Sequence, residues 1–182
     1  MTTTQNLHLP QWEADDRIMR TDFNEAFSKL DAGVAGCPIV KLAEAALTGD
    51  GARLSVSLAG IDLNDYAKLE LCATVNGTPV VIRANGISSG YNNSAGGNNS
   101  FSRVGYNGDY DSFPLIATFS GWDSCSLLCA VSYGAGMKAE NLSGKLSLPD
   151  SFSLQSIDLV ADNSYGYLLH AGTKAVLYGY RK

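Results

Sequence analysis

Few residues in this sequence could perform acid–base, nucleophilic or metal chemistry. The 182-residue chain has two histidines and four cysteines, namely His8, His170, Cys37, Cys72, Cys125 and Cys129. His170 has no neighbour in sequence that would make it a catalytic base or a metal ligand. Cys125 and Cys129 lie near no histidine or second close cysteine pair that would complete a zinc site. We therefore expect no enzyme, no cofactor and no metal, and cysteines that are reduced and buried.

Binding chemistry is concentrated in segment 85–111, which is rich in Gly, Asn, Ser and Tyr. Recognition loops use this composition because Tyr offers rigid contact area while Asn and Ser offer hydrogen bonds. A sugar needs an aromatic platform flanked by amides and carboxylates. Trp122, beside a later turn, adds a second aromatic candidate. The candidate ligand-binding residues are Tyr91, Asn92, Asn93, Asn98, Asn99, Tyr106, Asp109, Tyr110 and Trp122. The alternatives are a surface connection without a ligand and a loop that packs on a neighbouring subunit.

Charge and hydropathy exclude several classes of partner. Thirteen Lys and Arg against 18 Asp and Glu give a net charge of −5, and only 17% of residues are charged. Without a cluster of basic residues, we expect no binding to nucleic acid or to an anionic membrane. No apolar stretch approaches the roughly 18 residues of a membrane span. Residues 1–8 lack the basic and apolar regions of a secretory signal, so we expect cytoplasmic synthesis.

From about residue 39 the hydrophobic period is two, which indicates strands. Eight segments, separated by turn residues, predict a β-sandwich or jelly roll. Residues 39–48 fit either a strand or a helix. Asn76-Gly77 predicts a tight hairpin between two of the strands. The eight segments are 53–59, 67–75, 79–84, 115–120, 126–133, 143–148, 156–161 and 173–180.

Residues 1–38 form a separate segment with one predicted helix. Thr21 is its expected N-cap, and Gly33 or Gly36 its expected end. An apolar stripe with heptad-like spacing runs along it, formed by Met19, Phe23, Phe27, Leu30 and Val34. A helix this short needs that stripe to be covered, either by the following domain, 39–182, or by copies of itself.

Both ends of the chain resemble parts of phage fibres. Residues 9–31, with the distinctive core Asp22-Phe-Asn-Glu-Ala-Phe, resemble the N-terminal module of tail-fibre-like and minor structural proteins of phages and prophages of Gram-positive gut bacteria. Residues 171–182 are similar to the last strand of receptor-binding heads in the same group. Residues 47–51 and 66–71 are similar to the opening strands of such heads.

The resemblance implies a homotrimeric virion protein, anchored to tail, baseplate or collar proteins through its N-terminal segment. Its helix would trimerise, residues 39–48 would be a strand, and the β-sandwich head would bind a host surface glycan without catalysis. No binding residue carries over from the family. The alternative is a purely structural virion protein that contacts only other virion proteins, and a polysaccharide depolymerase ranks third.

Overall fold

The computed structural model describes residues 2–5, 8–17, 19–77, 79–93, 100–104, 110–122, 126–135, 138–149, 152–162 and 166–182. The chain divides into two compact units, Met1–Pro38 and Ile39–Lys182. We call them the N-terminal unit and the β unit and describe each by itself.

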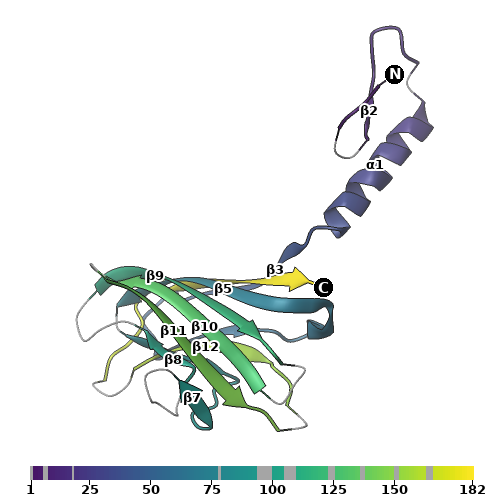
Figure 1. Cartoon of the computed structure of the whole chain (residues 1–182). Helices are drawn as coiled ribbons and strands as arrows, with labels where there is room; N and C mark the ends of the chain where they lie inside the picture. Colours follow the sequence, from purple (N-terminus) through teal and green to yellow (C-terminus); the bar gives the residue numbers. More distant parts are fainter. Residues whose placement is uncertain are drawn as a thin grey trace. The chain divides into compact units, whose positions relative to one another are not determined.

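The N-terminal unit combines a short β-ladder with one helix (Figure 1). Strands β1 (Thr2–Thr3) and β2 (Pro10–Gln11) pair antiparallel, and α1 spans Arg20–Ala35. Met19 is the N-cap, and the Asp22 carboxylate accepts a hydrogen bond from its N–H at 2.9 Å. The prediction of Thr21 as N-cap was wrong, because the helix begins earlier and the Asp22 carboxylate satisfies the free N–H. Gly36 ends the helix, as one of the two predicted glycines.

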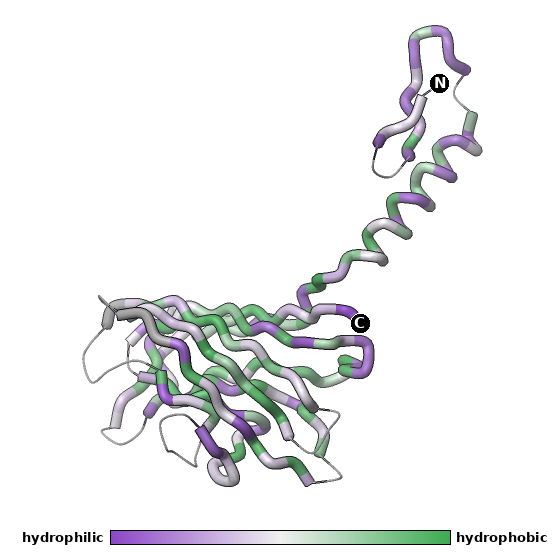
Figure 2. Tube along the Cα trace, in the orientation of Figure 1, coloured by the Kyte–Doolittle hydropathy of each residue, from purple (hydrophilic) through white to green (hydrophobic). Residues whose placement is uncertain are grey.

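Aromatic side chains cluster within this unit while the helical stripe stays exposed. The Trp12 ring lies 5.2 Å from the Phe23 ring, and Phe23 lies 6.5 Å from Phe27. Figure 2 shows hydrophobic residues recurring along α1 between hydrophilic ones. The five stripe residues nevertheless keep large exposed fractions: Met19 47%, Phe23 44%, Phe27 64%, Leu30 38% and Val34 73%. The contacts within this unit therefore leave an apolar helical surface uncovered.

The β unit is built almost entirely of strands. Residues 39–46 are a strand, which decides between the two conformations that the sequence left open. A short 3-10 helix, η1 (Leu63–Asp65), precedes the strand that begins at Tyr66. The strands are β3 (Ile39–Ala46), β4 (Arg53–Ser57), β5 (Tyr66–Gly77), β6 (Val80–Ala84), β7 (Tyr91–Asn93), β8 (Ser102–Val104), β9 (Tyr110–Ser120), β10 (Ser126–Ala135), β11 (Lys138–Ser147), β12 (Ser156–Ala161) and β13 (Lys174–Arg181).

These strands form two antiparallel sheets that share one hydrophobic core (Figure 1). The seven-stranded sheet has the order β3-β13-β5-β9-β10-β11-β7, and the four-stranded sheet has the order β4-β12-β6-β8. Alternate residues of each strand face inward, as the sequence of β13 predicts: Ala175 and Leu177 are buried while Val176 and Tyr178 face outward. The largest fully buried side chains come from both sheets and from the connections beside them: Phe101, Phe113, Phe119, Leu69, Leu71, Ile82, Leu115, Leu127, Ile157, Leu159, Leu169 and Leu177.

The strand prediction was wrong in several details, and β7 and β8 are absent from the eight predicted segments. Asn76-Gly77 forms no hairpin, because β5 and β6 belong to different sheets and the chain crosses between them there. β9 begins at Tyr110 rather than at residue 115, and β11 at Lys138 rather than at residue 143. Polar residues on the outward face of a strand weaken the alternation by which its ends are recognised.

The connections gather at two ends of the β unit. At the first, which we call the Ile39 end, the strand register brings together the start of β3, the end of β13 and connections 58–65 and 148–155. At the opposite, His170 end lie connections 47–52, 77–79 and 162–173. Loop residues far apart in sequence are therefore brought together at each end.

Cysteines in the described residues form no disulfide, as expected, but their burial differs. Cys129 is buried in the core, and burial raises the pKa of its thiol. Cys37 is exposed, contrary to the prediction, because it follows α1 at the end of the N-terminal unit rather than lying in a strand.

Gly144 on β11 lies close to the backbone of Phe101, and a substitution at Gly144 tests this contact. A methyl group there would overlap the backbone carbonyl of Phe101. We expect Gly144→Ala to lower the free energy of unfolding by about 2–3 kcal/mol, because backbone must move to admit the new atom. Urea denaturation measures this, with Gly49→Ala as the control, since nothing lies within 4 Å of a methyl at that position. Equal losses in both variants would contradict the packing described.

Candidate functional site

Tyr91, the first of the predicted ligand-binding residues, is part of the core. Its side chain is 4% exposed, and its ring packs edge-on against Phe101 with 4.8 Å between centroids. Its hydroxyl accepts the N–H of Ala84 at 2.9 Å, and burial raises the pKa of Tyr91 to about 12. The ring therefore offers no face to a ligand, and its hydroxyl instead joins β7 to the end of β6.

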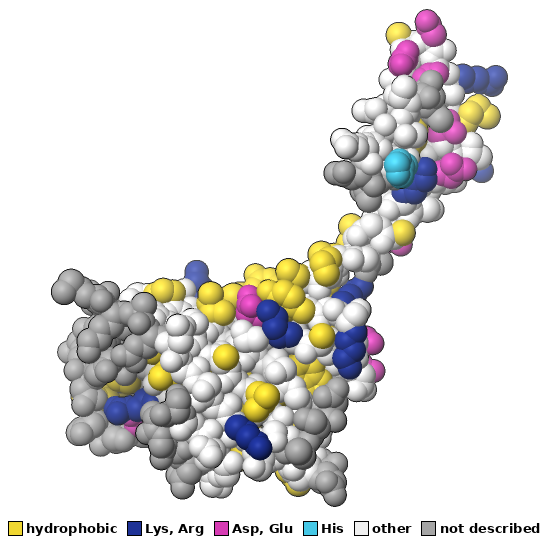
Figure 3. All heavy atoms as spheres, viewed as in Figure 1, with side chains coloured by type: hydrophobic (Ala, Val, Ile, Leu, Met, Phe, Trp, Pro, Cys, Tyr) yellow, Lys and Arg dark blue, Asp and Glu magenta, His cyan; other side chains and the backbone are white. Residues whose placement is uncertain are grey.

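Asn92 and Asn93 line a hollow on the outside of the seven-stranded sheet. We call this the outer hollow; its volume is about 620 Å³. Asn92 is exposed, whereas the Asn93 amide is nearly buried and donates to the Ser100 carbonyl at 3.1 Å. The walls are mostly uncharged and come from β7, β9, β10 and β11: Asn92, Asn93, Thr118, Ser120, Leu128, Cys129, Ala130, Ser143, Gly144 and Lys145. Figure 3 shows that the surface over β10 and β11 is mostly uncharged.

The remaining loop candidates are not gathered around this hollow. Asn98, Asn99, Tyr106 and Asp109 lie outside the described residues, and so does the side chain of Tyr110. The backbone of Tyr110 pairs with Gly77, at the His170 end of the β unit. The described parts of segment 85–111 therefore contribute to the sheet edge and to an end of the β unit, rather than forming one site.

Trp122 lines a groove at the Ile39 end, which we call the Trp122 groove. Its volume is about 290 Å³, and its walls are connection 58–64, residues 152–155 and the indole. The Trp122 Nε1–H donates to the Leu63 carbonyl at 3.2 Å, which fixes the ring against the start of η1. The Asp62 carboxylate accepts the N–H of Asn64 at 3.0 Å and caps the same 3-10 helix. One wall is therefore rigid before any ligand arrives.

Asn85 holds the opposite wall of the groove. Its Nδ2 donates to the Ser153 carbonyl at 2.8 Å, and its Oδ1 accepts the N–H groups of Gln155 at 2.7 Å and Ser156 at 3.0 Å. Asn85 has a φ of 52°, a left-handed conformation that Asn tolerates better than most residues. Asn85 therefore positions Ser153 and Gln155, which form this wall of the groove.

The side chains that line the groove are mostly polar and uncharged or apolar. Asp62, Asn64, Ser153 and Gln155 supply carboxylate, amide and hydroxyl groups, and Trp122 supplies an aromatic edge. Of the lining residues that the structure describes, Asp62 is the only charged one. Such a lining can accept and donate several hydrogen bonds without requiring a charged partner.

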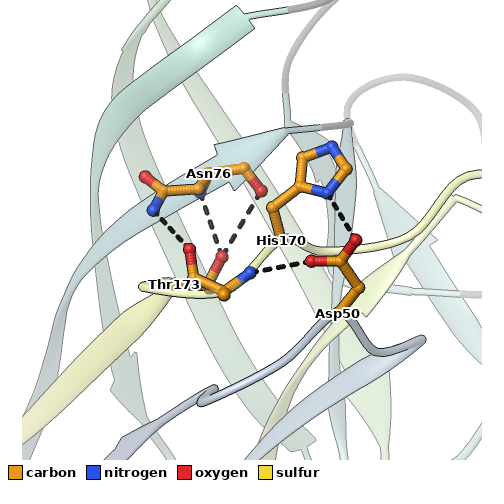
Figure 4. Close-up of polar contacts among 5 residues, drawn as sticks. Asp50, Asn76, His170 and Thr173 are labelled. Atoms are coloured by element: carbon orange, nitrogen blue, oxygen red, sulfur yellow. Dashed lines mark hydrogen bonds and ion pairs between the residues drawn. The ribbon is translucent and has the colours of Figure 1, made fainter.

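A polar cluster at the His170 end fixes connection 162–173 (Figure 4). The Asp50 carboxylate accepts the Ala171 N–H at 3.0 Å and lies 3.2 Å from His170 Nδ1. Thr173 Oγ1 accepts the Asn76 N–H at 3.0 Å, and Asn76 Nδ2 donates to the Ala171 carbonyl at 3.0 Å. Together they join connection 47–52, the end of β5 and connection 162–173, so the described contacts give His170 a positional role.

Gly77 lets the His170 ring lie against the chain in this cluster. Its φ of +100° suits glycine, and a Cβ there would overlap the imidazole. A hairpin was predicted from Asn76-Gly77. The chain instead crosses between the two sheets at this pair, and the His170 ring packs against Gly77.

Asp62, Asn85 and Gln155 were missed as groove residues. Each resembles ordinary turn composition in sequence, and the three are brought together only by the crossing of the chain between sheets. The pair Asn85-Gly86 opens segment 85–111 and is a turn signal in the sequence. The segment with which the Asn85 side chain forms hydrogen bonds, residues 153–156, lies about 70 positions away in the sequence.

Within the described residues, no group of three or more His, Cys, Asp and Glu side chains could hold a metal ion. No described helix has both the length and the apolar character of a membrane span. Comparisons with family models, with curated proteins and with solved structures found no match to this chain.

The Asp50 cluster gives the stability of the β unit a defined pH dependence. The Ala171 N–H, followed by His170, lowers the pKa of Asp50 below its usual 3.8. The ionised carboxylate therefore stabilises the fold above pH 3.8, and this stabilisation is lost as the pH falls through the lowered pKa. We expect the stability difference between wild type and Asp50→Asn to be present at pH 6 and to shrink towards pH 2, as measured by urea denaturation. A difference that stays constant over this range would contradict the contact.

Proposed function

We propose that this chain is a fibre-type virion adhesin whose β unit binds an uncharged bacterial surface polysaccharide in the Trp122 groove. The observation that carries the proposal is the lining of that groove, in which a fixed indole stands beside amide, hydroxyl and carboxylate groups. Sugars present the complementary surfaces, since their C–H faces contact aromatic rings and their hydroxyls bond to polar groups.

The size and rigidity of the groove support this ligand class. A volume of about 290 Å³ is at the lower limit of ligand sites, which suits a short stretch of a polysaccharide rather than a large cofactor. Both walls are held by hydrogen bonds to backbone, through Asp62 and Asn85. Preorganised walls reduce the conformational entropy that binding would otherwise cost.

The polar groups of the groove favour binding over hydrolysis. Glycosidases place two carboxylates about 5–10 Å apart across the scissile bond. Among the described groove residues only Asp62 has a carboxylate, and it caps η1. The proposed role of this site is therefore recognition, with selectivity set by which sugar hydroxyls meet the amides of Asn64 and Gln155.

The proposed architecture is a jelly roll on a self-associating helix. In support, β3-β13-β5-β9 in one sheet and β4-β12-β6-β8 in the other give two four-stranded sheets joined by repeated crossings, as in an eight-stranded jelly roll. β10 and β11 then extend one sheet as an added hairpin. We further propose that α1 forms a parallel trimer, since its stripe is exposed and has heptad-like spacing.

The virion location rests on the resemblance of residues 9–31 and 171–182 to phage fibre proteins. On this proposal the N-terminal unit attaches to other virion proteins, while the β unit contacts the host glycan. No nucleic acid, membrane or cofactor takes part.

Trp122→Ala tests the proposed glycan site. We expect at least a tenfold loss of affinity for purified cell-wall polysaccharide of a Gram-positive host, measured by isothermal titration, because the aromatic wall is removed. Gln155→Ala should weaken binding by a smaller factor. Tyr178→Ala, on the outward face of β13, is the matched control and should leave affinity unchanged. Near-ultraviolet circular dichroism verifies that each variant is folded.

Equal affinity of Trp122→Ala and wild type would contradict binding of the polysaccharide in the Trp122 groove. If the wild type binds neither host cells nor their polysaccharide but still assembles into particles, the protein is a purely structural virion component instead.

The exposed stripe of α1 generates a separate prediction about mass. We expect light scattering to give three times the 19.3 kDa chain mass for the wild type and one chain mass for the double variant Phe23→Asp, Phe27→Asp. Two carboxylates in the stripe would place charge where apolar side chains of three copies meet. Glu25→Gln, on another face of the helix, is the control. A wild-type monomer would contradict association through this helix.

A further inference from the structure

Asp158 is a buried carboxylate on the outer face of the four-stranded sheet. Its neighbours on β12, Ile157 and Leu159, are fully buried in the core, so the Asp158 side chain points to the opposite face. There it lies opposite Ser55 on β4 and Arg83 on β6, yet only 1% of it is exposed. An ionisable side chain is rarely buried to this degree without defined partners.

The hydrogen-bond partners of Asp158 lie on either side of one contact. Its Oδ2 accepts the Gly86 N–H at 2.6 Å and the Ser156 hydroxyl at 3.1 Å. Its Oδ1 is buried and accepts no hydrogen bond from the described residues. Gly86 directly follows Asn85, and Ser156 is the residue whose N–H Asn85 Oδ1 accepts. The carboxylate therefore holds together the two segments that meet at Asn85 and Ser156.

Asn85 and Gly86 form the tight turn that this carboxylate contacts. Their φ angles are 52° and 68°, and the Ile87 N–H donates to the Ala84 carbonyl at 2.9 Å. Positive φ at both central residues is the pattern of a type I′ turn, for which Asn-Gly is a favoured sequence. A left-handed conformation costs Asn more than Gly, so a contact that fixes Gly86 also favours this conformation of Asn85.

We infer that Asp158 is a positioning residue for the Trp122 groove, although it does not line the groove. Asp158 fixes the turn that contains Asn85. Asn85 in turn accepts the Gln155 N–H at 2.7 Å and donates to the Ser153 carbonyl at 2.8 Å, and these two residues form one wall of the groove. Loss of the carboxylate therefore loosens this wall. The consequence for ligand affinity rests on the proposed function, whereas the positioning rests on these contacts alone.

Amide hydrogen exchange of the full-length chain, followed by NMR, tests the positioning without any ligand. Asp158→Ala is the variant. Asp50→Ala is the matched control, because Asp50 also accepts a loop N–H, that of Ala171, but at the His170 end. Relative to core amides of β5, which report global unfolding, we expect the Gln155 and Ser156 amides to exchange about tenfold faster in Asp158→Ala and unchanged in Asp50→Ala. Unchanged exchange in Asp158→Ala would overturn the inference, whether or not a polysaccharide binds.

Isothermal titration with the host polysaccharide tests the consequence for binding. We expect Asp158→Ala to lower the affinity about tenfold, because the ligand must then order the wall formed by Ser153 and Gln155, and Asp50→Ala to leave it unchanged. Asp158→Asn keeps an acceptor for the Gly86 N–H and should retain most of the affinity. Equal affinities of Asp158→Ala and wild type would overturn the inference, since a role in stability alone would give that result. A wild type that binds no polysaccharide would contradict the proposed function, and the exchange rates would still judge the positioning.

A double-mutant cycle tests whether Asp158 acts through Asn85. Asn85→Gly removes the three side-chain hydrogen bonds to residues 153–156 but keeps a residue that adopts positive φ readily. We expect Asn85→Gly to lower the affinity by at least as much as Asp158→Ala, and the double variant to lose no more than Asn85→Gly alone. Losses that multiply in the double variant would overturn the inference, because Asp158 would then act by another route.

A milder variant covers the case in which Asp158→Ala does not fold. Ser156→Ala removes only the hydroxyl that donates to the Asp158 carboxylate. It should speed exchange of the Gln155 amide by a smaller factor than Asp158→Ala, and unchanged exchange of that amide would overturn the inference.

Discussion

Burial of one face of each strand between two sheets is the constraint on which the β unit depends. Apolar side chains such as Leu71, Phe119 and Leu159 gain stability only if the sheets lie face to face. To achieve this, the chain must cross repeatedly between the sheets, as it does at Asn76-Gly77. The crossings gather loops from distant segments at two ends, and both the Trp122 groove and the Asp50–His170 cluster are consequences of that gathering.

Fixed connections explain how a protein with so few charged residues can offer a specific surface. Asn85, Asp62 and Asp50 each accept hydrogen bonds from backbone N–H groups and so help to hold the loops that they contact. On the proposed function, these contacts hold the lining side chains of the groove in position before the ligand binds. On the proposed function, the low charge of the groove suits a neutral ligand.

Much of the fold could be predicted from sequence, because two-residue periodicity reports directly on half-buried strands. It located β12 at Ser156–Ala161 and separated the faces of β13. Pairing across sheets is a long-range property, so Asn76-Gly77 was taken for a hairpin. Composition identified segment 85–111 as polar and aromatic, yet it could not distinguish the buried Tyr91 from an exposed tyrosine. Only Trp122, Asn92 and Asn93 among the predicted ligand residues line a described hollow.

The most direct test of the central claim uses the two tryptophans as reporters in one spectrum. Trp122 is in the proposed groove, and Trp12 is in the N-terminal unit, so their indole N–H signals separate glycan binding from any other effect. Titration of ¹⁵N-labelled protein with oligosaccharides released from the host polysaccharide should shift the Trp122 indole signal and leave that of Trp12 in place. Binding that leaves the Trp122 signal unmoved would contradict the account.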